Sequence, residues 1–172
     1  MYGCNPAYKT PQVDSLAQVR FMVDRSDKKL EQVSTYIHPD DQCSKAQKLR
    51  DLASKVQLGG VPKEEVNIGM LKHADTHYDP YNYIEVKVNS NERLNFTMIG
   101  ASWLANCYIS ASFQPIKNNQ YEVLFTHVYM PDKDDNYCKV DVFRLVKKDG
   151  DVAKITDTPI KQKKPPCWHF YN

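Results

Sequence analysis

Apolar and polar residues alternate in eight short segments of the chain, the pattern expected of β-strands with one buried face. The segments are 19–24, 31–38, 84–88, 94–98, 107–113, 121–129, 140–145 and 152–156. The first two flank the charged turn RSDKK and predict a hairpin. Polar turn clusters such as QPIKNNQ and KKDGD separate later segments. Strands at this spacing predict an antiparallel sandwich or barrel, and an immunoglobulin-like β-sandwich of about seven to eight strands is the expected fold.

The spacing of apolar residues changes once from the alternation of a strand to the intervals of a helix, after Cys43. Ser44 and Gln47 have the spacing of a capping box. Apolar residues then follow at helical intervals, at Leu49, Leu52, Ala53 and Val56. A Gly-Gly pair supplies the backbone freedom that ends a helix. The pattern predicts one short helix over residues 44–57, inside a single domain that spans 17–172 and closes with a C-terminal tail.

Composition narrows the class of protein. The chain has 172 residues, of which 41% are hydrophobic and 26% charged, which favours one soluble globular domain over a disordered chain. The formal net charge of +2 is too small to indicate a nucleic-acid binder. His73 and His77 have a zinc-like spacing, but no HExxH, nucleophile-elbow or phosphate-loop motif is present. The sequence predicts no metal, no cofactor and no enzymatic activity.

The five cysteines indicate the compartment. No CxxC or Cys/His cluster is present, so a zinc or redox centre is not predicted. Cys107 and Cys138 begin two strands that we expect to be neighbours, and Cys43 and Cys167 lie near the helix and in the tail. We predict the bridges Cys107–Cys138 and Cys43–Cys167, worth about 3.7 and 4.9 kcal/mol by loop entropy, although four cysteines permit three pairings. Oxidised pairs indicate an exported protein; buried thiols in a cytosolic protein are the alternative.

The two predicted bridges use four of the five cysteines, and Cys4 is the fifth. Met1-Tyr2-Gly3-Cys4 resembles the end of a bacterial lipoprotein signal, in which the cysteine is lipidated, and Asn5 would imply sorting to the outer membrane. Residues 1–16 contain no apolar periodicity, which predicts a lipidation site followed by a flexible tether. A single thiol in a loose terminus is the alternative. No complete signal peptide precedes Cys4.

Tyrosine is concentrated in the stretch HYDPYNY, within a long segment that has no sustained period. Tyrosine offers a large contact surface at low rotamer-entropy cost, and long loops on rigid β-scaffolds are frequently functional. The candidate partner-binding residues are His77, Tyr78, Asp79, Tyr81 and Tyr83. The alternative is that Tyr81 and Tyr83 only fasten the loop to the sandwich.

The region 17–145 resembles a group of small bacterial envelope lipoproteins. Its motifs are a cysteine-bearing strand that ends in F-x-P, a Y-x-V-x-F strand and a C-x-V strand, which here are CYISASFQP, YEVLFTHV and CKVDVF. The resemblance implies a β-sandwich in which Cys107 and Cys138 are bridged. Some proteins of this kind are immunity proteins that neutralise toxic lipases delivered by type VI secretion. The segment 44–56 and the tail after Pro159 depart from the pattern.

Three functions follow as hypotheses. The first is a non-enzymatic periplasmic lipoprotein, anchored to the outer membrane through Cys4, that blocks a lipase-type protein toxin as an immunity protein. The second is a structural or adhesive envelope lipoprotein without a toxin partner. The third is a secreted β-barrel that carries a small ligand.

Overall fold

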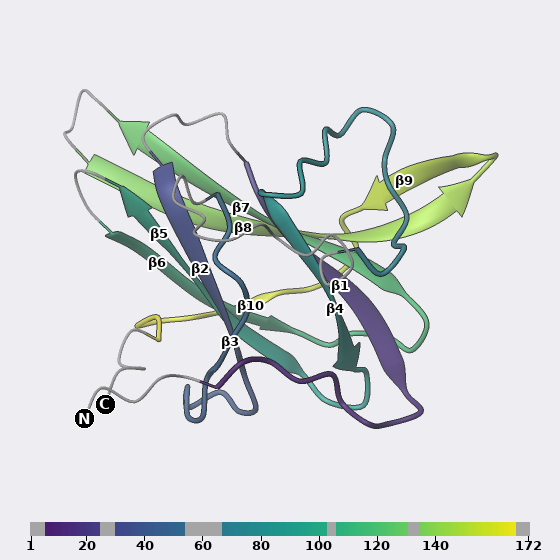
Figure 1. Ribbon diagram of the computed structural model, residues 1–172, viewed down its shortest axis with the longest axis horizontal. Coiled ribbons are helices and arrows are strands. Elements are labelled where there is room, and N and C mark those ends of the chain that lie inside the picture. The colour runs from purple at the N-terminus through teal and green to yellow at the C-terminus, as the bar shows by residue number, and fades with distance from the viewer. Residues whose placement is uncertain (1–5, 25–29, 54–66, 103–105, 131–134, 168–172) are drawn as a thin grey trace.

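The computed structural model describes residues 6–24, 30–53, 67–102, 106–130 and 135–167. Within them lie ten strands: β1 (Leu16–Val23), β2 (Leu30–His38), β3 (Gln47–Lys48), β4 (Tyr83–Asn89), β5 (Leu94–Ser102), β6 (Asn106–Phe113), β7 (Gln120–Met130), β8 (Asp135–Lys148), β9 (Asp151–Ile155) and β10 (Lys161–Lys163). They form two five-stranded sheets (Figure 1). We call them the β1 sheet, with the order β4-β1-β7-β8-β9, and the β5 sheet, with the order β10-β6-β5-β2-β3.

The two layers confirm the predicted β-sandwich. Each of the eight alternating segments forms a strand, and β3 and β10 are additional strands of two and three residues. The sheets remain separate along their edges, so the closed small-ligand barrel considered above is wrong. Among the described residues there is no helix, and none therefore that is long and apolar enough to cross a membrane.

The helix predicted over 44–57 is not formed in residues 44–53, the part of it that the structure describes. Strand β3 pairs with β2 there, and the backbone N–H groups of Leu49 and Leu52 each donate to a β2 carbonyl at 2.8 Å. Positive φ angles at Lys45 (47°) and Ala53 (58°) are also incompatible with a helix. Leu49 and Leu52 are both buried, so their spacing reflects packing against the sandwich rather than a helical face.

The predicted hairpin of the first two strands is also wrong, because β1 and β2 belong to different sheets. Strand β1 pairs antiparallel with β4 and parallel with β7, whereas β2 lies between β5 and β3. Alternation shows that a strand has one buried face, but it does not show which strand lies beside it. Adjacent strands in sequence do pair in most folds, and this crossover from one layer to the other is an exception.

Aromatic side chains join the two layers in the core. Phe21 of the β1 sheet meets Phe96 of the β5 sheet edge to face, with ring centroids 5.5 Å apart. The ring centroid of Phe113, also in the β5 sheet, lies 6.4 Å from that of Phe96. The ring centroid of Tyr121, in the β1 sheet, lies 5.1 Å from that of Phe113. All four rings are buried. Such tilted and edge-on pairs stabilise a core beyond their buried area, which favours one arrangement of the layers.

The structure contains both predicted disulfide bridges. Cys107 on β6 and Cys138 on β8 are joined with a Cα–Cα distance of 5.9 Å, and these strands lie in opposite sheets rather than side by side as expected. The bridge therefore fastens the two layers to each other. Cys43 and Cys167 are joined at a Cα–Cα distance of 5.8 Å and hold the end of the chain after β10 against the loop after β2.

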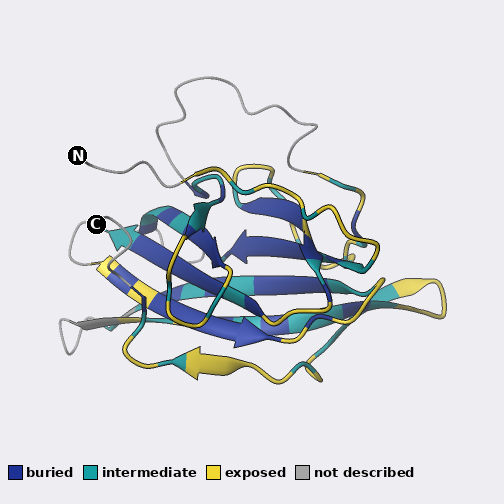
Figure 2. Ribbon diagram, turned by 90° about the horizontal axis from the view of Figure 1, so that it is seen from below, coloured by how far each residue is buried: buried dark blue, intermediate teal, exposed yellow. Residues whose placement is uncertain are grey.

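Part of the segment predicted to be a tether is attached to the domain. The N–H of Tyr8 donates to the carbonyl of Lys48 at 3.1 Å, and the N–H of Lys48 donates to the carbonyl of Pro6 at 2.9 Å. The Tyr8 hydroxyl donates to the carbonyl of Lys87 at 2.8 Å. The chain thus joins the sandwich before β1, and Cys4 lies outside the described residues. Figure 2 shows the buried residues gathered on the strands of the two sheets and the exposed ones on the loops, on β10 and on the tip of the β8–β9 hairpin.

Candidate functional site

Three charged side chains lie side by side on the outer face of the β1 sheet. Arg20 of β1 is in register with Glu85 of β4 on one side and with Glu122 of β7 on the other. The guanidinium of Arg20 donates to Glu85 at 2.6 and 3.0 Å and to Glu122 at 3.0 Å. All three side chains are inaccessible to solvent. The outer face of a sheet is normally wet, so something must cover this cluster.

The cover is the segment 67–82, which we call the covering loop. Its backbone N–H group at Ile68 donates to Glu85 at 2.7 Å, and the Arg20 guanidinium donates to the carbonyl of Leu71 at 3.0 Å. The N–H of Leu71 donates to the side-chain oxygen of Gln120 at 2.6 Å. Buried charges are tolerated where such bonds satisfy their remaining donors and acceptors. The charged cluster and the loop backbone thus stabilise each other.

Two of the predicted partner-binding tyrosines form the aromatic part of this cover. Tyr78 lies with its ring centroid 4.4 Å from the guanidinium carbon of Arg20, and Tyr83 lies at 5.5 Å. Their rings meet edge to face at 6.0 Å. The Tyr78 hydroxyl donates to Glu122 at 3.1 Å and accepts from the N–H of His73 at 3.0 Å, and burial raises the pKa of Tyr78. Tyr83 is buried, so both tyrosines fasten the loop.

The other predicted residues lie at the surface of the loop. Asp79 accepts from the N–H of Tyr81 at 2.9 Å and from the side-chain amide of Asn82 at 3.3 Å, which closes a tight Asx turn. The Tyr81 side chain is 51% exposed, although its carbonyl accepts from the N–H of Ala53 at 2.9 Å. His77 is exposed as well. The structure therefore places four of the five predicted residues in the covering loop and Tyr83 at the start of β4, and of the five it exposes His77 and Tyr81.

A hollow of about 400 Å³ lies beside the exposed His77. Its floor comes from the outer face of the β1 sheet, at Met22 and Leu124, and its rim from Asp75 and Lys154. Lys154 also forms an ion pair with Glu122, which links the rim to the buried charged cluster. The hollow and His77 form a mixed apolar and polar surface, and Tyr81 is exposed on the same loop. Among the described residues, no group of three or more His, Cys, Asp or Glu side chains could hold a metal ion.

The charged cluster was not anticipated from the sequence. Arg20 and Glu85 each occupy the polar position of an alternating strand, which indicates an ordinary solvated face. Only the pairing of β1 with both β4 and β7, together with the loop folding back over them, brings the charges together and buries them. A signal could have been the apolar Met22 and Leu124, which also stand at positions expected to face water.

Comparisons with known proteins found no matching protein family, no matching curated protein and no matching solved structure. The resemblance to envelope lipoproteins remains a prediction from short motifs.

Proposed function

We propose that this protein is a non-enzymatic binding protein of the bacterial envelope that neutralises a toxic protein by occupying its surface. In the sharpest form of the proposal, it is an immunity protein to a lipase-type effector delivered by type VI secretion. The contact surface is the exposed part of the covering loop, centred on Tyr81 and His77. The motifs of the core strands support the type of effector, and the two disulfides support an oxidising compartment.

The observation that carries the proposal is the contrast between a fixed loop and its exposed aromatic tip. Arg50 donates to the carbonyls of Pro80 at 2.6 Å and of Tyr83 at 3.0 Å, so the turn that carries Tyr81 is held from below as well as by Asp79. A binding surface that is already ordered loses little conformational entropy when a partner docks. Exposed tyrosines on such surfaces are common binding hot spots.

Anchoring through Cys4 is the second part of the proposal. A lipidated cysteine that carries several acyl chains would hold the domain stably at the membrane. In the native precursor, Cys4→Ser should release the protein from membranes while its unfolding temperature stays the same. Continued membrane association of the folded variant would contradict a simple lipid anchor.

The test of neutralisation first asks whether a lipase-like protein is encoded beside this gene, and then uses that protein as the effector. Purified protein should inhibit its hydrolysis of phospholipid vesicles in proportion to the amount added, up to one domain per effector, and the complex should survive gel filtration. Tyr81→Ala should weaken binding by about 2 kcal/mol or more, which is about 30-fold in Kd. Tyr108→Ala is the matched control, because Tyr108 is also exposed but lies on the β5 sheet.

Three results would contradict the proposal. Inhibition at far less than one domain per effector would exclude blocking by occupation. Equal loss of binding in both tyrosine variants would move the contact away from the covering loop. If no lipase-like protein is encoded nearby, the immunity role fails and the structural or adhesive envelope lipoprotein becomes the better hypothesis.

A further inference from the structure

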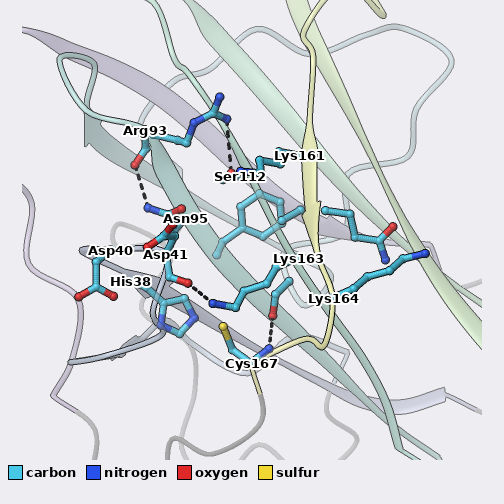
Figure 3. Close-up of a pocket in the computed structure, with 14 residues that line it drawn as sticks. His38, Asp40, Asp41, Arg93, Asn95, Ser112, Lys161, Lys163, Lys164 and Cys167 are labelled. Carbon is cyan, nitrogen blue, oxygen red and sulfur yellow. Dashed lines mark hydrogen bonds between the residues drawn. The ribbon is translucent and has the colours of Figure 1, made fainter.

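Another hollow in the described part of the chain lies on the opposite layer, on the outer face of the β5 sheet (Figure 3). It measures about 420 Å³ and runs between the loop after β2 and the tail that contains β10. We call it the tail groove. Cys167 lines one end, where its bridge to Cys43 fixes the tail to the loop. The volume lies within the range of small-molecule sites.

A connected set of polar side chains lies in and beneath the floor of the tail groove. The imidazole of His38 lies 3.0 Å from the Thr97 hydroxyl, and that hydroxyl lies 2.6 Å from the hydroxyl of Ser110. Ser110 also accepts from the N–H of Cys167 at 2.7 Å, so the tail is bonded directly to the floor. All of these residues are buried. Burial lowers the pKa of His38 to about 4, so the imidazole is neutral at physiological pH.

The rim of the tail groove carries an excess of positive charge. Four lining residues are cationic and two are carboxylates. Lys161 stands in register with Ser112, and Lys163 in register with Ser110, so both lysines continue the outward-facing rows of the floor. Arg93 also lines the groove, and its guanidinium donates to the Ser112 hydroxyl at 3.4 Å.

The two carboxylates do not balance that charge within the groove. Asp40 accepts from the N–H groups of Gln42 at 3.1 Å and of Ser44 at 3.2 Å, and from the Ser44 hydroxyl, so its oxygens serve the local turn. Lys163 donates to the backbone carbonyl of Asp41 rather than to its side chain. No ion pair between Arg93 or Lys161 and a carboxylate occurs among the described residues.

We propose that the tail groove binds a phosphate ester carried on a small hydroxylated molecule, such as a glycerol or sugar phosphate. The Arg93 guanidinium offers the planar donor pair that suits phosphate oxygens, and the tail lysines add point charges. The hydroxyls and amides beside them suit a polyol. This site lies on the other sheet from the covering loop and does not depend on the proposed function.

The experiment titrates the whole protein with glycerol 3-phosphate, inorganic phosphate and acetate, and follows backbone amide resonances. The phosphates should shift the amides of Ser110, Ser112 and Lys161 in a saturable way, whereas acetate at the same ionic strength should bind at least tenfold more weakly. Arg93→Gln/Lys161→Gln should weaken phosphate binding at least tenfold. Lys147→Gln/Lys148→Gln removes the same charge from the β8–β9 hairpin and should change it less than twofold. All four substituted residues are exposed, so both variants should keep the wild-type unfolding temperature.

A second arm distinguishes the source of the phosphate. Phosphatidylcholine vesicles with and without phosphatidic acid are compared in sedimentation with the wild-type protein and both variants. Loss of binding to the phosphatidic acid vesicles in the groove variant alone assigns the site to a lipid headgroup, whereas saturation by glycerol 3-phosphate without vesicle binding assigns it to a free ester. Equal weakening in both variants, equal affinity for acetate, or shifts confined to residues outside the groove would overturn the proposal.

Discussion

The guanidinium carbon of Arg20 lies 4.4 Å from the ring centroid of Tyr78, which joins a central strand to the loop that covers it. The same guanidinium is bonded to carboxylates of both neighbouring strands. One side chain therefore connects β4, β1, β7 and the covering loop. The conformation of the covering loop, and with it the placement of Tyr81, therefore depends on a buried charged cluster and not on apolar packing alone.

Replacing Arg20 with Met should be strongly destabilising, because it leaves Glu85 and Glu122 buried without their cation. Removal of one partner from a buried ionic group typically costs about 3 to 5 kcal/mol. Urea unfolding of the variant and the wild type measures the difference. Arg144→Met breaks the partly exposed pair of Arg144 with Asp157 and serves as the matched control, with a nearly unchanged midpoint. Similar losses in the two variants would show that the cluster contributes no more than a surface pair.

Tyr81 of the covering loop and Tyr83 at the start of β4 should differ in their effect on stability. Tyr83 is buried against Met22 and Tyr78, so Tyr83→Ala should lower the free energy of unfolding by about 3 kcal/mol. Tyr81 is exposed at the tip, so Tyr81→Ala should change it by less than about 0.5 kcal/mol. Thermal unfolding of both variants checks this difference. A large loss from Tyr81→Ala would mean that this side chain also fastens the loop, and its use as a contact residue would need another argument.

Alternation along the chain predicted the sandwich because each strand carries its own evidence of a buried face. Val19 and Phe21, for example, face the core, and Arg20 between them does not. The strands that pair with each strand come from segments that are distant in the sequence. The short spacing between β1 and β2 favoured a hairpin, yet β1 is completed by β4 and β7. Pairing is a property of the assembled sheets, which one strand's pattern does not contain.

The candidate site also depends on contacts between distant segments, which the local sequence pattern does not predict. The sequence identified the tyrosine-rich segment, but it could not separate the fastening Tyr83 from the exposed Tyr81, since both have the same composition around them. Tyr83 is buried because β4 pairs with β1, which places this ring against Met22, a residue far away in the sequence. Likewise, Leu49 and Leu52 have a helical spacing, but the hydrogen bonds available on the edge of β2 and the bridge at Cys43 favour an extended path. Non-local bonds override local periodicity in both cases.

The two disulfides should contribute differently to stability. The Cys107–Cys138 loop spans 31 residues and the Cys43–Cys167 loop spans 124, so loop entropy alone would make the second more stabilising. However, Cys107–Cys138 joins the two layers, whereas the other bridge fastens the tail. We expect Cys107→Ala/Cys138→Ala to lower the free energy of unfolding by the larger amount, within the usual range of about 2 to 5 kcal/mol.

Hydrogen exchange provides the complementary measurement for the bridges. Cys43→Ala/Cys167→Ala should increase exchange at β10 and leave the central strands protected, because the tail is held by that bridge and by short pairing with β6. The Cys107→Ala/Cys138→Ala variant should increase exchange in both sheets. The reverse order of stability, or uniform exchange in both variants, would contradict this division of roles.

His38 should make the stability depend on pH. Burial lowers its pKa from 6.5 to about 4 in the folded chain; Asp40 opposes this shift and Lys163 adds to it. The unfolded chain therefore binds a proton more readily than the folded one between these values, so stability is fully present above pH 6.5 and is lost as the pH falls towards 4. The loss should be about 1 to 3 kcal/mol. His38→Gln, whose amide can still bond to Thr97, removes the titrating group. Urea unfolding at several pH values should show the advantage of the wild type over this variant shrinking between pH 7 and pH 4.5, whereas a constant difference would mean that His38 titrates alike in both states.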